Sequence, residues 1–169
     1  MGCVQVYTGN GKGKTTAAIG LAIRALGAGM RVYFAQFLKS GDYSEKNVLK
    51  TLDNLVLRQY GAGGFITRHP SDEDRAMASR GVEEARETLR SGAYDLVILD
   101  EVNVACSLGL ITKNDVLSLL RERRDPTELV LTGRNAAPEL IEAVDLVTEM
   151  RDVKHYFAAG VTARKGIES

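Results

Sequence analysis

Cysteine is scarce in this sequence, which contains only two, Cys3 and Cys106, in 169 residues. The two lie far apart and form no CxxC pair, so the pattern excludes a zinc ribbon. Disulfides are rare in reducing compartments, and we expect none in this chain. A chain of this length can instead bury a hydrophobic core of its own.

The sequence also lacks an excess of charge and a long apolar run. Lysine plus arginine equals aspartate plus glutamate at 22 each, whereas nucleic-acid binders usually show a basic excess or stripe. No stretch approaches the roughly 20 apolar residues that a membrane span needs. The amino terminus starts with a strand-like run rather than the basic and apolar regions of a secretory signal. We therefore expect a cytoplasmic protein with neither nucleic acid nor a membrane as its partner.

Short apolar runs alternate with helical patterns along the chain, which is typical of βαβ units around a mostly parallel sheet. The runs expected to form strands are 4–8, 31–37, 55–60, 96–100, 129–132 and 146–149. Because such runs are apolar on both faces, they suit strands that helices cover on both sides. Helices are expected at about 14–26 and after Ser71, Thr112 and Pro138. Ser71 is a candidate N-cap because Asp74 follows it three residues later.

A glycine-rich segment stands directly between the first predicted strand and the first predicted helix, as the Walker A motif requires. Its residues are Gly9, Asn10, Gly11, Lys12, Gly13, Lys14, Thr15 and Thr16. Glycines let successive backbone N–H groups point at phosphate oxygens, and the helix N-terminus adds its dipole. Lys14 would place a positive charge on the phosphates, and the Thr15 hydroxyl would reach Mg²⁺. The strict motif has glycine where this chain has Thr8, but the glycines that follow can supply the flexibility.

The strand expected at 96–100 delivers two acids at its carboxyl end, Asp100 and Glu101. This is the Walker B arrangement, in which carboxylates hold Mg²⁺ directly or through water. Alone, the glycine-rich segment could be an ordinary turn, and the two acids could simply be exposed to solvent. Together, the two motifs indicate an ATP site at the carboxyl edge of the sheet. We therefore predict an α/β fold of the three-layer αβα, P-loop NTPase-like (RecA-like) type. It would have a mostly parallel sheet and a single nucleotide-binding domain over residues 1–169.

Four segments and a C-terminal block resemble the P-loop type of ATP:corrinoid (cob(I)alamin) adenosyltransferases. The segments are 9–18 (GNGKGKTTAA), 36–39 (QFLK), 100–103 (DEVN) and 131–134 (LTGR), and the block covers 149–167. They span nearly the whole chain in the right order. Many families share the phosphate loop, whereas the C-terminal block is far more particular to this one.

The resemblance implies an enzyme of adenosylcobalamin biosynthesis that transfers the 5′-deoxyadenosyl group of ATP to the Co(I) of a corrinoid and releases triphosphate. It also implies a homodimer, an electron donor such as a flavoprotein, and ATP bound in reverse along the phosphate loop. Residues 9–16 would bind the triphosphate, with Lys14 as the catalytic charge. Thr15 and Glu101 would be the preferred ligands of Mg²⁺ or Mn²⁺, with Asp100 as the second choice.

Three further residues are candidates for the site. The resemblance implies that Phe65, which follows the glycine-rich segment 61–64, contacts the corrinoid, although a core position is equally well supported. His155 is a candidate cobalt ligand, but an axial imidazole would stabilise Co(II) against reduction, so a structural role or a supporting contact behind the site is favoured. Arg134 follows a strand end. It is a candidate for contact with the nucleotide or with a second subunit, and a surface ion pair is an equally supported alternative.

A nucleoside or nucleotide kinase is the alternative function. Such enzymes usually cover the γ-phosphate with a lid that carries arginines. The dense arginine cluster of this chain, Arg121, Arg123 and Arg124, is expected at a helix end, where cations interact favourably with the helix dipole. A RecA-like DNA-binding motor is a third reading, and the zero net charge argues against it.

Overall fold

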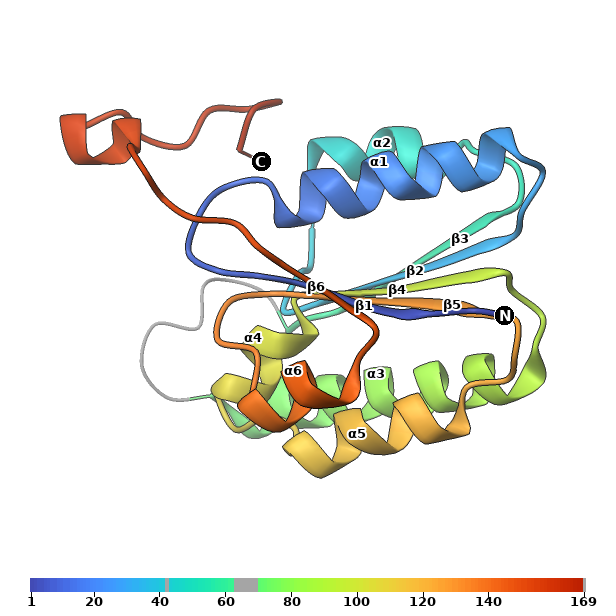
Figure 1. Ribbon diagram of the computed structural model, residues 1–169. Helices are drawn as coiled ribbons and strands as arrows, with labels where there is room; N and C mark the ends of the chain where they lie inside the picture. The colour runs from blue at the N-terminus through green and yellow to red at the C-terminus, as the bar shows by residue number, and fades with distance from the viewer. Residues whose placement is uncertain (42, 63–69, 169) are drawn as a thin grey trace.

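The computed structural model describes residues 1–41, 43–62 and 70–168, which form a six-stranded sheet with helices on both sides (Figure 1). The strands are β1 (Val4–Thr8), β2 (Val32–Phe37), β3 (Leu55–Tyr60), β4 (Leu96–Asp100), β5 (Glu128–Thr132) and β6 (Leu146–Glu149). Their order is β3-β2-β4-β5-β1-β6, and all neighbouring pairs are parallel. The predicted α/β fold with a mostly parallel sheet is confirmed, and the predicted strand limits differ from these by at most one residue.

Helices cover both faces of the sheet, which gives the three predicted layers (Figure 1). One face carries α1 (Lys14–Gly27) and α2 (Ser44–Leu49), and the other carries α3 (Asp72–Ser91), α4 (Val102–Ser107), α5 (Lys113–Glu122) and α6 (Pro138–Ala143). After β6 the chain continues into a segment with the 3₁₀ turn η1 (Tyr156–Ala159). Within the described part of the chain, no helix is long and apolar enough to cross a bilayer.

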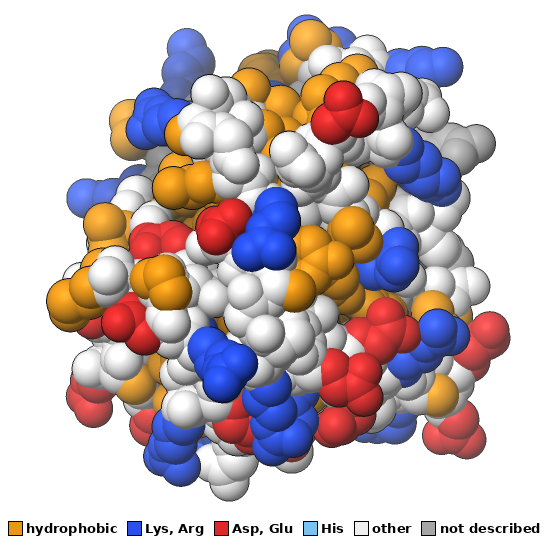
Figure 2. Space-filling view, turned by 90° about the vertical axis from the view of Figure 1, so that its right-hand side faces the viewer, with side chains coloured by type: hydrophobic (Ala, Val, Ile, Leu, Met, Phe, Trp, Pro, Cys, Tyr) orange, Lys and Arg blue, Asp and Glu red, His pale blue; other side chains and the backbone are white. Residues whose placement is uncertain are grey.

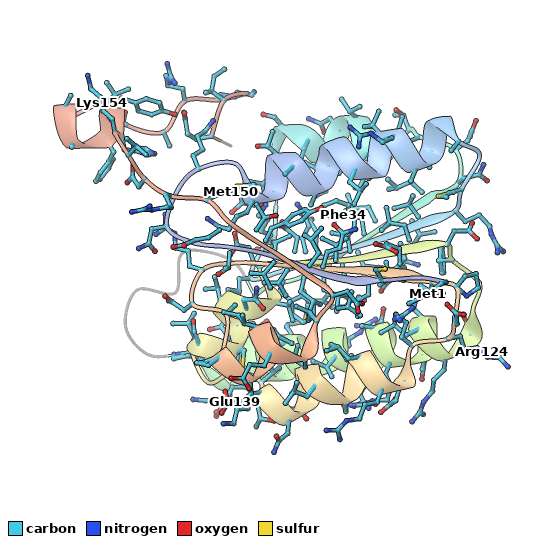
Figure 3. All side chains as sticks on the ribbon, viewed as in Figure 1. Met1, Phe34, Arg124, Glu139, Met150 and Lys154 are labelled. Atoms are coloured by element: carbon cyan, nitrogen blue, oxygen red, sulfur yellow. The ribbon has the colours of Figure 1, made fainter. Side chains whose placement is uncertain are left out.

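The sheet divides the apolar core into two clusters, one under each helical layer. Strand β2 supplies both: Phe34 packs with α1 residues such as Ala22, whereas Phe37 packs with Val82 on the α3 side. Figure 3 shows Phe34 between the sheet and α1. Successive side chains of a strand point to opposite faces, so all six residues of β2 are buried. The continuous apolar run of this strand is explained by helices on both of its sides.

The edge strand β6 departs from this pattern, and the expectation that helices cover both of its faces is wrong. All four of its residues are exposed, including Leu146 and Val147 at 44% and 40%. The strand stands last in the strand order, next to β1, whereas α1 packs on β2, β4 and β5. Its position beyond the covering helices leaves both of its faces open.

Helix starts follow the sequence signals where these are strong. Ser71 caps α3: its Oγ accepts the N–H of Asp74 at 3.1 Å, and the Asp74 carboxylate accepts the N–H of Ser71 at 2.9 Å. Thr112 caps α5 in the same way with Asp115. Pro138 is the first residue of α6, a position where the missing N–H costs no hydrogen bond. The six-residue helices α2 and α4 have no side-chain cap and were not predicted.

The face at the amino ends of the strands carries acidic and basic side chains side by side (Figure 2). This mixture fits the equal numbers of positive and negative residues in the chain. Met1 and Arg124 lie at this end of the molecule, whereas Met150 and Lys154 lie toward the other end (Figure 3).

Two helical glycines test how tightly the core is packed. Ala normally stabilises a helix interior by about 1 kcal/mol relative to Gly. A Cβ on Gly81 of α3 would lie 2.8 Å from Phe37 Cε1 and 2.9 Å from the ring of Tyr60. Gly81→Ala should therefore destabilise the protein by about 1–3 kcal/mol in urea denaturation. Gly20→Ala in α1 is the control and should stabilise the protein, because nothing lies within 4 Å of the added Cβ. A more stable Gly81→Ala protein would contradict this packing.

Candidate active site

The strand order brings the two predicted motifs together. Strand β5 lies between β1 and β4, and the carboxyl ends of these parallel strands share one edge of the sheet. The loop 9–13 leaves β1 at this edge and enters α1 at Lys14, while Asp100 ends β4 and Glu101 follows it. Ligands of α/β proteins bind outside the carboxyl ends of the strands, so this edge is the candidate active site.

Two separate constraints require glycine in the loop. Gly9 and Gly13 have φ values of 91° and 121°, which residues with a Cβ avoid. Gly9 and Gly11 also lie against the backbone that follows β6, where an added Cβ would stand 2.4 Å and 2.8 Å, respectively, from the Met150 carbonyl oxygen. The sequence predicted the need for flexibility, and the structure adds a need for space.

The chain after β6 binds the phosphate loop along one side. The N–H of Met150 donates to the Thr8 carbonyl at 2.8 Å, and the Met150 carbonyl accepts the N–H of Gly11 at 2.7 Å. Figure 3 shows Met150 where the chain leaves the sheet and passes the loop. Lys12 makes a further link, because its Nζ donates to the Ile167 carbonyl at 3.0 Å. The shape of the loop therefore depends on residues far from it in the sequence.

Thr8 replaces the first glycine of the strict Walker A motif, and its surroundings explain why. It is the last residue of β1, it is 8% exposed, and its Oγ1 accepts the N–H of Ala136 at 3.4 Å. Its backbone belongs to the strand rather than to the loop. The curled part of the loop therefore begins one residue later, at Gly9.

Lys14 is folded back onto the loop. Its Nζ donates to the carbonyl oxygens of Gly9 and Gly11, both at 2.7 Å, and its side chain is buried. Burial lowers the pKa of Lys14 and Arg134 lowers it further, while the nearby carboxylates oppose this change only in part. An anion in the loop would favour the charged ammonium. This arrangement fits the predicted role of Lys14 as a phosphate ligand.

Asp100 is fully buried at the end of β4, and three side chains bind it. The hydroxyls of Thr15 and Thr132 donate to its Oδ1 at 2.9 Å and 2.6 Å. Lys39, which follows β2, donates to Oδ2 at 3.1 Å and forms an ion pair with the carboxylate. These partners come from α1, β5 and the loop after β2, so one carboxylate joins three segments of the chain.

Glu101 has a left-handed backbone with a φ of 61° and lines the cavity beside the loop. Its N–H donates to Thr132 Oγ1 at 3.0 Å. Burial raises the pKa of Glu101, and the neighbouring Asp100 raises it further. The sequence favoured Glu101 over Asp100 as a metal ligand; in the structure the Thr15 hydroxyl contacts Asp100, and Glu101 stands beside this pair.

These oxygen atoms suit a hard divalent cation such as Mg²⁺. Proteins usually hold Mg²⁺ by one or two carboxylates together with substrate phosphates and waters. Asp100 and Thr15 offer such oxygens 2.9 Å apart, with Glu101 nearby. In residues 1–41, 43–62 and 70–168, no group of three or more His, Cys, Asp or Glu side chains forms a metal site. This donor set fits a cation that completes its coordination with the phosphates of a nucleotide.

A cavity of about 680 Å³ opens beside the loop, which is within the size range of small-molecule sites. Loop and helix residues 11–16 line it, as do Lys39, Tyr43, Glu101 and Arg134. Apolar lining comes from Leu38, Val104 and Leu108, and the segment after β6 contributes His155, Ala163, Ile167 and Glu168. The cavity thus combines cationic and acidic groups with apolar surface.

The predicted site residues differ in where they lie relative to this cavity, and Arg134 and His155 are among those that line it. Residues 11–16 and Glu101 line the cavity, whereas Gly9 and Asn10 belong to the loop but not to the lining, and Asp100 contacts Thr15 from a buried position. Phe65 lies outside the described residues. The Nδ1 of His155 accepts the N–H of Phe157 at 3.1 Å and caps η1.

Sequence reasoning missed the roles of Lys39 and Thr132. Both stood within segments that resemble the family, 36–39 and 131–134, but neither was assigned a contact. Each follows or ends a strand of the central sheet, β2 or β5, at the same edge as Asp100. Position at the carboxyl end of a parallel strand was the signal that could have identified them.

The family model and the similar proteins all indicate the same family. The chain matches the family described as ATP:corrinoid adenosyltransferase BtuR/CobO/CobP over residues 1–169. It is 38% identical to a corrinoid adenosyltransferase of a Sinorhizobium species over 171 residues, which cover 99% of this chain and 80% of that protein. Corrinoid adenosyltransferases of Pseudomonas aeruginosa and Escherichia coli are 39% and 38% identical, with 99% of this chain and 83% and 85% of those proteins covered.

The contact between Gly11 and the segment after β6 leads to a prediction about nucleotide binding. Gly11 lacks the positive φ of Gly9 and Gly13, so an added Cβ tests the contact alone. Gly11→Ala should displace the backbone at Met150 and weaken ATP binding at least about tenfold, or roughly 1.4 kcal/mol. Gly27→Ala, at the exposed end of α1 with nothing within 4 Å of its Cβ, should bind ATP normally. Calorimetric titration with ATP measures both variants, and equal affinities would show that the contact does not shape the loop.

Proposed function

The chain belongs to the ATP:corrinoid adenosyltransferase family BtuR/CobO/CobP, and from this premise we propose how its residues perform the reaction. The family and the relatives support ATP-dependent adenosylation of corrinoids, a transferase reaction of cobalamin biosynthesis. One observation carries the assignment of the site: Lys14, Thr15 and Asp100 converge beside one cavity.

In the proposed reaction, the Co(I) of a corrinoid attacks C5′ of ATP. Cobalt supplies the electron pair of the new bond to carbon and becomes formally Co(III). The bond between C5′ and its oxygen breaks, both electrons stay on that oxygen, and triphosphate leaves. Negative charge therefore grows at the α-phosphate end of the leaving group, and stabilisation at that end accelerates the reaction.

We propose that the phosphate loop holds the leaving group. Residues Gly9, Asn10, Gly11, Lys12, Gly13, Lys14, Thr15 and Thr16 would bind the triphosphate through backbone N–H groups and side chains. The ammonium of Lys14, now bound to two loop carbonyls, would exchange them for phosphate oxygens. With ATP reversed along the loop, Lys14 would serve the α-phosphate end, where the charge grows.

Mg²⁺ or Mn²⁺ is the proposed companion of ATP. Thr15, Glu101 and Asp100 would hold it, and when bound it would neutralise part of the phosphate charge. The protein itself keeps these oxygens in place through Thr132. The Thr132 hydroxyl donates to Asp100 and accepts the N–H of Glu101, so one side chain positions both acids.

The corrinoid is proposed to bind at the mouth of the cavity. Leu108 and Ile167 line the cavity and are 38% and 55% exposed, which offers apolar surface to a large macrocycle. Phe65 is a second proposed contact, supported by the family resemblance alone.

A homodimer and an electron donor such as a flavoprotein are further parts of the proposal. Co(I) has to be produced by reduction before it can attack C5′, so the reaction needs a reductant. The family resemblance supports the dimer. A cytoplasmic location is supported by Cys3 and Cys106, which are both free, as thiols are in a reducing compartment.

The arginine cluster lies at a helix end, as the sequence predicted, and this position gives a kinase no support. The arginine cluster lies at and after the end of α5, where Arg123 donates to the Thr127 carbonyl. Arg124 lines a polar hollow that also includes Thr127. Figure 3 shows Arg124 at the end of the molecule away from Met150 and the phosphate loop. From there the cluster cannot cover a γ-phosphate.

Product analysis tests the proposed function. With ATP, Mg²⁺ and a chemically reduced corrinoid, the protein should release intact triphosphate in equal amount to the adenosylated corrinoid. Corrinoid absorbance and anion-exchange chromatography measure the two products. Formation of ADP and a phosphorylated small molecule would establish the kinase instead.

Replacement of Lys14 tests the assignment of the site. Lys14→Ala should lower kcat by roughly 10²–10³, the usual effect of removing one stabiliser of transition-state charge. The assay starts from Co(I), so that reduction does not limit the rate. Lys113→Ala is the matched control: Lys113 is exposed and forms a surface ion pair with Glu139, so its loss should leave kcat unchanged. Wild-type turnover by Lys14→Ala would remove this lysine from the site.

A further inference from the structure

Lys39 contacts a proposed metal ligand but has no role in the reaction described above. Its Nζ lies 3.1 Å from Asp100 Oδ2 and 3.3 Å from Glu45 Oε1, and its side chain is 15% exposed. It also lines the cavity that Lys14 and Thr15 line. A cation in this place affects both the metal ligands and any anion in the cavity.

In the structure, Lys39 is the counter-ion of Asp100. A buried carboxylate is costly unless it is both hydrogen-bonded and paired with a charge. Thr15 and Thr132 supply hydrogen bonds without charge, and Lys39 supplies the positive charge. Burial lowers the pKa of Lys39, but the two carboxylates that it contacts outweigh this effect and raise it overall. The side chain is therefore an ammonium at neutral pH, and it neutralises Asp100 as a bound cation would.

Lys39 has further partners that would keep it at the cavity if it left Asp100. Glu45 in α2 accepts from Lys39 and also from Gln36 Nε2, at 3.2 Å, and Gln36 is fully buried. The ring of Tyr43, another residue of the cavity lining, lies 5.1 Å from the Lys39 Nζ. These contacts hold the ammonium near the cavity without fixing it to one carboxylate.

A divalent cation on Asp100 would compete with this ammonium. Like charges in a partly buried site repel more strongly than in water, so the two cannot share one carboxylate at low cost. A lysine side chain is flexible and can redirect its donors. Triphosphate in the loop would offer it a new anionic partner in the same cavity.

We propose that Lys39 is a triphosphate-binding residue that neutralises Asp100 before the substrates bind and exchanges this carboxylate for triphosphate when the divalent cation takes its place. The inference rests on the proposed function for the identity of the metal ligand. No proton moves and no covalent bond changes in the exchange. Its effect is to bring a further ammonium, from outside the phosphate loop, to the leaving group.

Metal and triphosphate binding test this proposal without the corrinoid. Without nucleotide, Lys39→Met should bind Mn²⁺ at least about tenfold more tightly than the wild type, because the competing ammonium is gone. With Mg²⁺ present, its affinity for inorganic triphosphate should fall at least about tenfold. Lys50→Met removes the same charge at an exposed site just after α2 and should change neither affinity. Electron paramagnetic resonance measures free Mn²⁺, and calorimetry measures triphosphate binding.

Tighter Mn²⁺ binding together with weaker triphosphate binding supports the exchange. Two unchanged affinities would make Lys39 a structural cross-link, and a parallel loss of both would indicate a collapsed site; either result overturns the proposal. Lys39→Arg keeps the charge and should keep most of the triphosphate affinity. Since no measurement depends on adenosyl transfer, a failure of the proposed function would be seen separately, in the product analysis.

A second comparison applies if Lys39→Met fails to fold because Asp100 is left unpaired. In an Asp100→Asn background the lysine has no carboxylate to neutralise at this position. With EDTA present, adding Lys39→Met to that background should still weaken triphosphate binding by about fivefold or more, or roughly 1 kcal/mol. Equal triphosphate affinity in the single and double variants would overturn the proposal.

Discussion

The burial of one charged carboxylate, that of Asp100, determines how the site is built. An ion removed from water must regain hydrogen bonds and a counter-charge from the protein. Asp100 obtains them from Thr15 at the start of α1, from Thr132 at the end of β5 and from Lys39 after β2. These contacts tie the first helix and two strands to the tip of β4. The phosphate loop lies between β1 and α1, so the same contacts fix where its helical end stands.

Lys14 and Glu101 lie near this carboxylate, and their pKa values are shifted in opposite directions by one common cause. Burial lowers the pKa of Lys14 and raises the pKa of Glu101, so it disfavours the charged form of each. A ligand that carries both a polyanion and a divalent cation would favour both charged forms at once. The electrostatics therefore suit a nucleotide with its metal better than either alone. This preference depends on the burial of Lys14 and Glu101 as well as on the types of residue in the site.

Local sequence patterns predicted the strands and the capped helix starts, but they did not predict the short helices or contacts that depend on the strand order. The unbroken apolar run of β2 indicated a strand between two helical layers, and the spacing of Ser71 and Asp74 predicted the start of α3. Helices α2 and α4 have six residues each, too few to show a helical period. Strand β6 begins with two apolar residues, Leu146 and Val147, as β4 does, and only the strand order shows that it lies at an edge. The pairing of Lys39 with Asp100 likewise depends on β2 and β4 being neighbours, which no local pattern states.

The place of β1 in the sheet has a consequence for the order in which the protein can assemble. Both of its neighbours, β5 and β6, come from the last third of the sequence, and the loop that follows it is completed by hydrogen bonds to Met150. A ribosome makes β1 and the loop before β5 and β6, so these residues have no strand to pair with until β5 has emerged. Pairing between strands that are distant in the sequence slows folding, because the entropy cost of closing the long intervening loop comes before the contacts form. Strands β2, β3 and β4 pair among themselves and can form earlier. The phosphate loop therefore has to wait for β5, β6 and Met150 before its surroundings are complete, although its own residues are translated before all three.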